Sequence, residues 1–433
     1  MKKGGKKSCH HCIDKKIVFY ILLTMWMAFV LYGKGSVLGT GLVKTASAKE
    51  IIAKGYCSSE DNWKKVKWKL YKNGDLVVYG KGKMTDAGDL DGDSPNPPSA
   101  VSPWYKYRKQ IKRAVFKEGV TLVGVKAFYG CINMEEIQWN STIWAIEYEA
   151  FCKCRSLKKV ELPPSVLWVS DDAFSHCSSL EKLHLPNTVK YWGDWVFFHC
   201  DKLKEVTMDE EMDLFTYQWS DDTEAGGYSM FACCGALKKI HFCQGITAIP
   251  DEFFYQCPLL SDIEIPETVT YLGSCPAYGK KVYKVPKQVE ILGYGACCQN
   301  KTLERIILPE NLKSVRRSAF WGCKNLKEIS FPENTTNLGS SLFEGCTSLE
   351  TVEIKAPLRY LNPYVFANCN HLKNLIIHSA DLKNGNAFDK IRTTKTIHIY
   401  VPAEKLADYK KLFSQRKNKK VQLKWHSLDE LQA

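Results

Sequence analysis

Apolar residues recur along most of this chain with a period of 23 residues. The repeated pattern is Ala-Phe-x-x-Cys-x-x-Leu-x-x-Val-x-Leu-Pro, which occupies residues 150–163 and returns at residues 173–186 with Leu183 in place of the valine. A fixed period of this length is typical of a solenoid, in which each repeat forms one coil that stacks on its neighbours. The phenylalanine of the pattern recurs at Phe128, Phe151, Phe174, Phe197, Phe231, Phe254, Phe320, Phe343, Phe366 and Phe388.

Within a coil, apolar and polar residues alternate as they do in a half-buried strand. Val160 and Leu162 should therefore point into the core. Lys159 and Glu161 alternate with them and should point outward. The proline that follows should end the strand, because it has no N–H to donate to the next ladder. A second apolar segment then returns the chain to the core.

The pattern predicts a repeat solenoid, rich in β structure, with about eleven coils of 23 residues. It divides the chain into a targeting segment (residues 1–48), an N-terminal β cap with a first partial coil (49–126), the solenoid (127–386) and a C-terminal cap with a charged tail (387–433). The coils begin near Ala127, Ala150, Ala173, Val196, Met230, Phe253, Pro276, Ala296, Ala319, Leu342 and Val365.

Both ends of the solenoid are predicted to be closed, because an open coil would expose its core and its strand edges. At the N-terminal end, apolar residues flank Asn73-Gly74 and predict a hairpin over residues 68–79 with a turn of the primed type. At the C-terminal end, residues 397–401 continue the strand pattern. Apolar positions at helical spacing then predict a helix over residues 403–413 that covers the last coil.

Two coils depart from the period. Phe197 and Phe231 lie 34 positions apart, and the added stretch Asp209–Tyr228 is acidic and aromatic. Insertions of this kind map to loops on one face of a solenoid, which is often the binding face. The coil that begins at Pro276 is shorter and lacks the Cys-x-x-Leu segment. These departures are therefore the first places in which to look for function.

The N-terminal segment has the layout of a secretory signal. Lysines dominate residues 1–16, an apolar run covers residues 17–32, and Ala46-Ser47-Ala48 offers a cleavage site before Lys49. The long spacer before that site leaves an uncleaved membrane anchor as the alternative. Either way the protein is expected to be secreted or held at a bacterial cell surface, and to meet the membrane only through this segment.

Composition and charge narrow the possible functions. The 433 residues are 45% hydrophobic and 12% aromatic, which excludes a disordered chain. The formal net charge is +13, but residues 1–48 contain eight lysines and one aspartate and so supply about half of it. The remaining excess is spread thinly, so no nucleic-acid partner is expected.

The cysteines also follow the period. Nine of the 18 occupy one repeat position, and Asn300 takes that position in another coil. A small, buried, hydrogen-bonding position accepts both residue types, whereas a disulfide framework does not, so we expect reduced thiols packed in a column. The column comprises Cys131, Cys154, Cys177, Cys200, Cys234, Cys257, Cys323, Cys346 and Cys369.

Motifs for catalysis or cofactor binding are weak. No phosphate-binding Gly-Lys-Ser/Thr loop and no dinucleotide fingerprint occurs. Ser175-His176 puts a hydroxyl beside a base, but adjacent residues in a coil should point in different directions. The carboxylate pairs Asp171-Asp172 and Asp221-Asp222 are expected to be solvated turn residues, and Cys9–Cys12 lies in the basic signal region. We therefore expect no enzyme activity, no cofactor and no metal.

Two surfaces are candidates for binding a partner. The outward positions of the strands are polar and mixed in sign, which suits protein recognition. Clustered aromatic residues on coils are typical anchors for proteins or sugars. The candidate residues are Lys159, Glu161, Lys182 and His184 on the strands, Trp144, Trp168, Tyr191 and Trp195 on the return segments, and Tyr217 and Trp219 in the insertion.

The repeats resemble those of the BspA-like leucine-rich repeat family of surface proteins. The resemblance covers almost all of residues 55–415, including the lead-in at Gly80–Met84, the Pro103–Tyr105 segment and the closing Val401–Tyr409 segment. It implies a secreted or surface protein that binds other proteins or host surfaces without catalysis.

Three functions therefore stand as hypotheses at this point. The first is a surface module that binds proteins or glycans. The second is an accessory to an extracellular hydrolase, or a weak hydrolase that uses the carboxylates of the insertion. The third is a structural spacer with no ligand.

Overall fold

The computed structural model describes residues 50–58, 65–84, 102–212, 228–260, 263–362, 364–384, 386–388, 390–391, 393, 395–414 and 421–431. They belong to one compact unit, Glu50–Ala433. The predicted signal segment, the Cys9–Cys12 cluster and most of the insertion, including Tyr217 and Trp219, lie outside the described residues. In the part of the chain that is described, no helix is long and apolar enough to cross a membrane.

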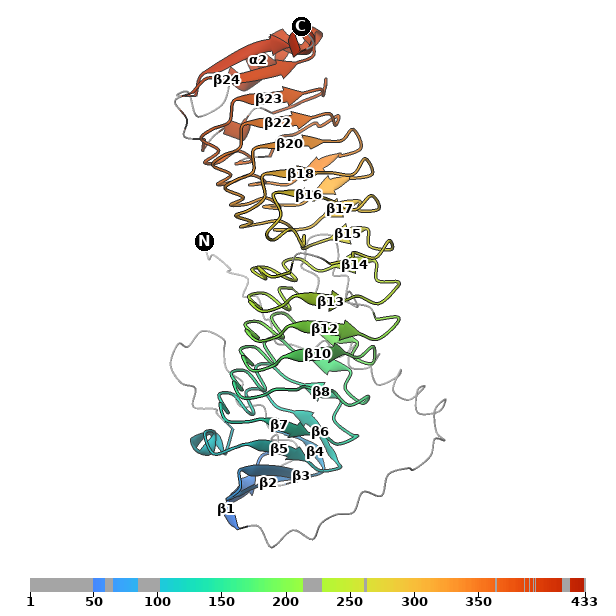
Figure 1. Ribbon diagram of the computed structural model, residues 1–433, viewed down its shortest axis with the longest axis vertical. Coiled ribbons are helices and arrows are strands. Elements are labelled where there is room, and N and C mark those ends of the chain that lie inside the picture. Colours follow the sequence, from blue (N-terminus) through green and yellow to red (C-terminus); the bar gives the residue numbers. More distant parts are fainter. Residues whose placement is uncertain are drawn as a thin grey trace, which may run out of the picture. The chain divides into compact units, whose positions relative to one another are not determined.

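The predicted solenoid is confirmed, with about 12 turns of about 23 residues. The leucine-containing segments form parallel strands whose outer surface we call the strand face (Figure 1). Pairing joins residues one repeat apart, such as Leu183 with Val206 and Val352 with Leu375. These strands are β5 (Arg113–Phe116), β7 (Glu136–Gln138), β10 (Lys182–Leu185), β12 (Glu205–Met208), β13 (Lys239–His241), β16 (Val282–Lys284), β18 (Arg305–Ile307), β20 (Glu328–Phe331), β22 (Thr351–Ile354), β23 (Asn374–Ile377) and β24 (Ile397–Val401).

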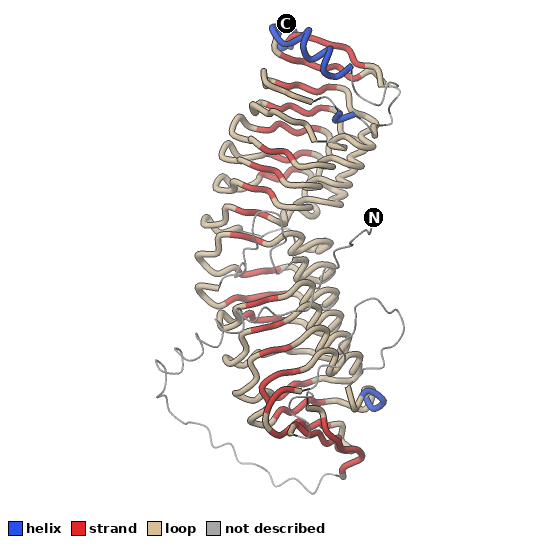
Figure 2. The backbone as a smooth tube through the Cα atoms, turned by 180° about the vertical axis from the view of Figure 1, so that it is seen from behind, coloured by secondary structure: helices blue, strands red, loops and turns tan. Residues whose placement is uncertain are grey.

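The returning apolar segments form a second series of shorter strands, whose outer surface we call the return face. Loops and turns make up most of each coil between the two series, as Figure 2 shows. The return strands are β4 (Gly82–Lys83), β6 (Val120–Val123), β8 (Ala145–Ile146), β9 (Trp168–Val169), β11 (Tyr191–Trp192), β14 (Ala248–Ile249), β15 (Tyr271–Leu272), β17 (Ile291–Leu292), β19 (Ser314–Val315) and β21 (Asn337–Leu338).

The repeated phenylalanines stack through the core. The Phe128 and Phe151 ring centroids lie 5.0 Å apart with planes inclined by 8°, and Phe343 and Phe366 lie 5.9 Å apart at 4°. Each of these side chains is fully buried. Because burying a phenylalanine contributes roughly 1.5–3 kcal/mol, this column is a main source of stability.

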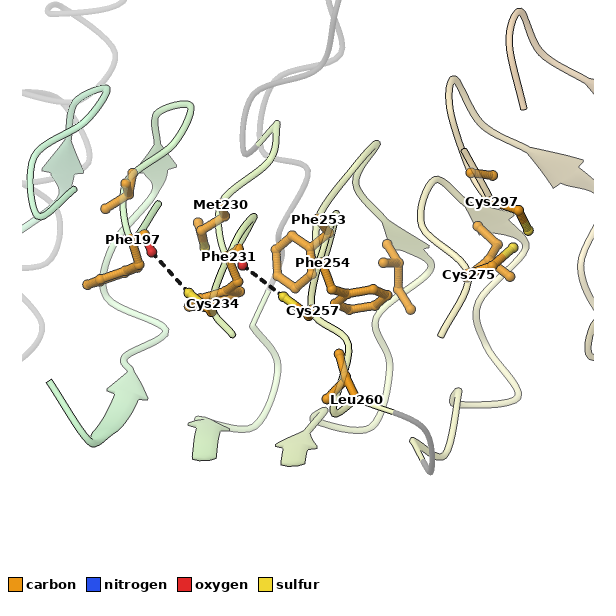
Figure 3. Packing of buried hydrophobic residues seen from close by; sticks show 14 of the residues in the cluster. Phe197, Met230, Phe231, Cys234, Phe253, Phe254, Cys257, Leu260, Cys275 and Cys297 are labelled. Atoms are coloured by element: carbon orange, nitrogen blue, oxygen red, sulfur yellow. Dashed lines mark hydrogen bonds between the residues drawn. The ribbon is translucent and has the colours of Figure 1, made fainter. Parts of the chain in front are cut away.

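The cysteine column is a row of buried free thiols, as predicted. From Cys154 onward, each column Sγ donates to a carbonyl of the preceding coil, as from Cys234 to Phe197 (3.2 Å) and from Cys257 to Phe231 (3.1 Å; Figure 3). Asn300 does the same with Nδ2, which donates to Ala277 O at 3.0 Å. The position therefore requires a small side chain with a donor.

Two positions in each regular coil adopt positive φ although most of them are not glycine. One lies immediately before the Ala-Phe pair, as at Glu149 (φ 50°), and the other before the column cysteine, as at Lys153 (φ 63°). The left-handed conformation costs roughly 1–2 kcal/mol per residue. Backbone hydrogen bonds to the next coil offset that cost, since Phe151 N donates to Ala173 O and Lys153 N donates to Ser175 O, both at 2.8 Å.

Side chains replace missing backbone contacts at the shortened coil. Ser274 Oγ accepts from Phe254 N (3.3 Å), and the Tyr278 hydroxyl accepts from Gln256 N (2.7 Å). Neighbouring regular coils use carbonyl oxygens for these bonds. Hydroxyl groups thus allow a coil without the Cys-x-x-Leu segment to remain in the stack.

The N-terminal hairpin is confirmed, but its turn is not of the primed type. Strands β2 (Val66–Tyr71) and β3 (Asp75–Gly80) pair antiparallel, and β1 (Ile51–Tyr56) pairs with β2. Gly74 alone of the turn residues has positive φ (90°), and its N–H bonds to Tyr71 O at 2.9 Å. This is a three-residue loop with a left-handed glycine, because primed two-residue turns require positive φ at Asn73 as well.

The C-terminal helix is confirmed and is followed by a strand that the sequence did not reveal. Helix α2 (Leu406–Ser414) buries Tyr409 and Phe413, and the Phe413 ring lies 5.7 Å from Phe388. Strand β25 (Leu423–Ser427) pairs with β24 and brings Trp425 to 5.4 Å from Phe413. The remaining short helices are η2 (Tyr105–Tyr107), η3 (Asn386–Phe388), η4 (Ala403–Lys405) and η5 (Leu428–Leu431).

Replacing one stacked phenylalanine should weaken the solenoid strongly. Phe343→Ala leaves a cavity between Phe320 and Phe366, so we expect the free energy of unfolding to fall by about 3–5 kcal/mol. Urea denaturation followed by circular dichroism measures the change. The control Trp321→Ala removes a side chain that is 40% exposed and should change stability by about 0.5 kcal/mol or less. Equal effects of the two substitutions would contradict the proposed role of the column.

Labelling with a thiol reagent should distinguish the reduced column from a disulfide set. Burial raises the pKa of the column thiol Cys323 to about 12, so native column cysteines should react slowly. Cys233 is the one described cysteine that is only partly buried and should react first. Mass spectrometry after denaturation without reductant should find all 18 cysteines labelled. Protected pairs in the denatured chain would contradict the prediction.

Candidate binding surfaces

The strand face places the predicted Lys182 and His184 within a network that spans three coils. Lys182 Nζ lies 3.2 Å from Glu205 Oε2, and His241 Nε2 lies 3.2 Å from the other oxygen of that carboxylate. The hydrogen bond from Lys182 is the main cause that lowers the pKa of Glu205. The side chains of Lys182, Glu205 and His241 are therefore already paired with one another across neighbouring coils.

His184 is held at both ring nitrogens. Nδ1 lies 2.9 Å from Thr207 Oγ1, and Nε2 lies 2.9 Å from Asp209 Oδ1, where the insertion begins. Lys159 and Glu161 lie one coil earlier, are both exposed and form an ion pair with each other. Four of the predicted residues thus share one exposed surface on adjacent coils.

Opposite charges spaced by one repeat are common along the solenoid. Glu304 accepts from Lys281 on one side (3.0 Å) and from Lys327 on the other (2.6 Å). Such pairs are exposed and contribute little stability individually. Sequence reasoning missed them, although the signal was present as opposite charges 23 residues apart.

The return face brings two predicted aromatic residues together. The Trp168 and Tyr191 rings stack at 3.7 Å with planes inclined by 13°, because their strands β9 and β11 pair in register. Burial raises the pKa of Tyr191. Trp144 is half-buried in the preceding coil, and Trp195 is 42% exposed. We call Trp144, Trp168, Tyr191 and Trp195 the aromatic patch.

Aspartates beside this patch bind the backbone of the next coil. Asp171 Oδ1 accepts from Asp194 N (2.9 Å), and Asp194 Oδ1 accepts from Tyr228 N (3.0 Å). A Cβ at Gly193 would lie 2.3 Å from Asp171 Oδ1, so glycine is required there. Asp171 and Asp172 are turn residues as predicted, but they are not freely solvated, since burial raises the pKa of Asp172 to about 6.

A similar carboxylate, which sequence reasoning missed, lies further along the return face. The Tyr271 hydroxyl donates to Asp251 Oδ1 at 2.7 Å. Burial raises the pKa of Asp251 to about 7. The two residues lie 20 positions apart, so the 23-residue period does not pair them.

The expectation that Ser175 and His176 point in different directions is wrong. Ser175 Oγ lies 2.8 Å from His176 Nδ1, because the left-handed backbone at His176 (φ 59°) turns its ring back. Ser175 is only 1% exposed, so a substrate cannot reach its hydroxyl. Among the described residues, no group of three or more His, Cys, Asp or Glu side chains is placed to hold a metal ion.

Stacked coils with a strand at most leucine segments define a leucine-rich repeat solenoid, although the predicted strand at residues 157–162 is not formed. A family model for the BspA type leucine-rich repeat region, in 6 copies, matches residues 104–218, 214–286 and 290–419. Since these matches cover well over half of the sequence, the chain belongs to this family. No curated protein matches it in sequence.

Structural comparison finds similarity to solved leucine-rich repeat proteins. One from Eubacterium ventriosum is 21% identical with a TM-score of 0.51, and the alignment covers 80% of this chain and 87% of that one. One from Bacteroides ovatus is also 21% identical, with a TM-score of 0.48 and coverage of 84% and 98%. A leucine rich cell surface protein from Faecalibacterium prausnitzii is 20% identical, with a TM-score of 0.42 and coverage of 72% and 93%.

The buried carboxylate of Asp251 should make stability depend on pH. Its pKa is about 7 in the folded chain and near its ordinary value of 3.8 in the unfolded chain. Between pH 4 and 7 the Asp251 carboxyl is protonated in the folded chain but ionised in the unfolded chain. Its contribution to the free energy of unfolding is therefore fully present below about pH 4 and is lost as the pH rises to 7.

We therefore expect the melting temperature of the wild type, relative to Asp251→Asn, to fall between pH 4 and 7 and then to level off. Thermal denaturation at several pH values measures this difference. Asp408→Asn is the control, because the Asp408 side chain is 73% exposed, and it should show no such trend. A difference that rises with pH would contradict the assignment.

Proposed function

We propose that this chain is an exported binding protein of a bacterial surface, which engages a protein or glycan and catalyses no reaction. The observation that carries this proposal is the display of side chains at coil spacing on two faces of a continuous leucine-rich repeat stack. Repeat stacks provide extended surfaces that suit recognition of large partners. The basic, apolar and small-residue order of residues 1–48 supports export.

The aromatic patch is the proposed contact region. Aromatic side chains supply large contact area at a low cost in conformational entropy and are enriched among residues that dominate binding energy. Trp195 presents much of its ring to solvent, whereas Trp168 and Tyr191 support one another. The insertion, which contains Tyr217 and Trp219, follows in the next coil and is proposed to extend this region.

Pull-down against a panel of host matrix proteins and cell-wall fragments tests the proposal. We expect the wild type to retain at least one member of the panel. Trp168→Ala combined with Tyr191→Ala should weaken that binding by about tenfold or more, since loss of central aromatic contacts typically costs over 1 kcal/mol. Trp195→Ala should weaken it too, and it leaves the Trp168–Tyr191 stack in place.

The matched control combines Leu259→Ala with Trp321→Ala, which removes exposed apolar side chains elsewhere. It should bind as the wild type does. Circular dichroism and melting curves confirm that each variant is folded. A wild type that retains no member of the panel would favour the structural spacer, and unchanged binding by the aromatic variants would place the contact elsewhere.

A further inference from the structure

The return strands end at β21, and the coil that follows leaves a hollow beside that strand. In regular coils a backbone N–H bonds to the preceding coil at this point, as from Gly339 N to Val315 O (2.8 Å). In the next coil a side chain takes over, and Asn362 Nδ2 donates to Leu338 O at 2.5 Å. The two coils therefore separate at the surface. The resulting hollow has a volume of about 460 Å³ and is lined by Thr336, Asn337, Pro357, Arg359, Tyr360 and Asn362.

One wall of the hollow is formed by residues 359–361, and hydrogen bonds from the following coil hold this wall in place. Asn384 Oδ1 accepts from Leu361 N (2.8 Å), and its Nδ2 donates to Leu361 O (2.9 Å). Arg359 O accepts from Lys383 N at 2.7 Å. The wall is thus fixed before a ligand arrives, which lowers the entropy cost of binding.

The lining combines an exposed ring with amide and guanidinium groups. Tyr360 is 58% exposed, more than any other large apolar side chain among the described residues. Arg359 Nε lies 3.2 Å from Asp381 Oδ2, and Lys383 pairs with the other oxygen of the same carboxylate, so these three groups carry one net positive charge. Asn337 and Asn362 add groups that can both donate and accept hydrogen bonds.

We propose that this hollow binds a saccharide. The Tyr360 ring offers an apolar face for the C–H side of a sugar ring. The amides and guanidinium suit hydroxyl groups, which both donate and accept, and the net positive charge of Arg359, Lys383 and Asp381 favours a sugar that also carries an acidic group. The volume lies within the usual range for small-ligand sites. This site is separate from the aromatic patch and goes beyond the proposed function.

An oligosaccharide array tests the inference directly. The full chain is applied to immobilised neutral, sialylated and sulfated oligosaccharides, and titration calorimetry then measures affinity for the strongest soluble one. We expect the sialylated or sulfated members to bind more tightly than the neutral ones, because Arg359 and Lys383 share a single carboxylate. Tyr360→Ala and Asn337→Ala should each lower the affinity by about tenfold or more, and Tyr360→Phe should lower it less because the ring remains. Trp321→Ala, an exposed aromatic outside the hollow, should bind as the wild type does.

Other outcomes would overturn the inference. They are absence of binding to every member of the array, binding confined to neutral members, and an affinity that Tyr360→Ala leaves unchanged. Extended peptides that pair with the edge of β21 are the competing ligand, and loss of peptide capture in Tyr360→Ala without any oligosaccharide binding would also overturn it. The variant with Trp168→Ala and Tyr191→Ala should retain saccharide binding, so the failure of this inference is distinguishable from failure of the proposed function.

Discussion

Hydrogen bonding from each coil to the next is the constraint on which this structure depends. Most of a coil is turn rather than strand, yet its buried N–H and C=O groups still require partners. The following coil supplies them even between turns, as in the bond from Phe174 N to Val196 O at 3.0 Å. No coil can satisfy its own backbone, so the stack must be continuous and its ends must be closed.

The same constraint explains the residues that recur inside each coil. The phenylalanine fills the space between stacked turns, and the cysteine supplies a second donor to a carbonyl that also accepts a hydrogen bond within its own turn. Asn300 shows that the donor, rather than the sulfur, is what the position requires. The left-handed residues are tolerated because their N–H groups then point at the next coil, so local strain is offset by contacts one repeat away.

The 23-residue period correctly predicts the features that depend on contacts between coils. It does not predict the features that depend on the local backbone conformation. The stack, its phenylalanine and cysteine columns and the register of Trp168 with Tyr191 all follow from residues spaced by one repeat. The contact between Ser175 and His176 depends on a left-handed dihedral angle that residue spacing does not report. Asp251 meets Tyr271 across strands at a spacing of 20, and the strand at Leu423–Ser427 follows a charged tail without a repeat pattern.

Where the period is intact, most side chains already serve a neighbouring coil. Glu304 is shared between two lysines, Asp194 binds the backbone beyond it, and Trp168 stacks on Tyr191. A partner that bound these groups would have to compete with those contacts, which lowers the net gain from each new interaction. Side chains are released from this role where neighbouring coils do not pair. Tyr360 stands exposed because its coil keeps the 23-residue period but does not pair with β21. An insertion into a coil is the other natural place for a solenoid to acquire a ligand, because insertions map to loops on one face.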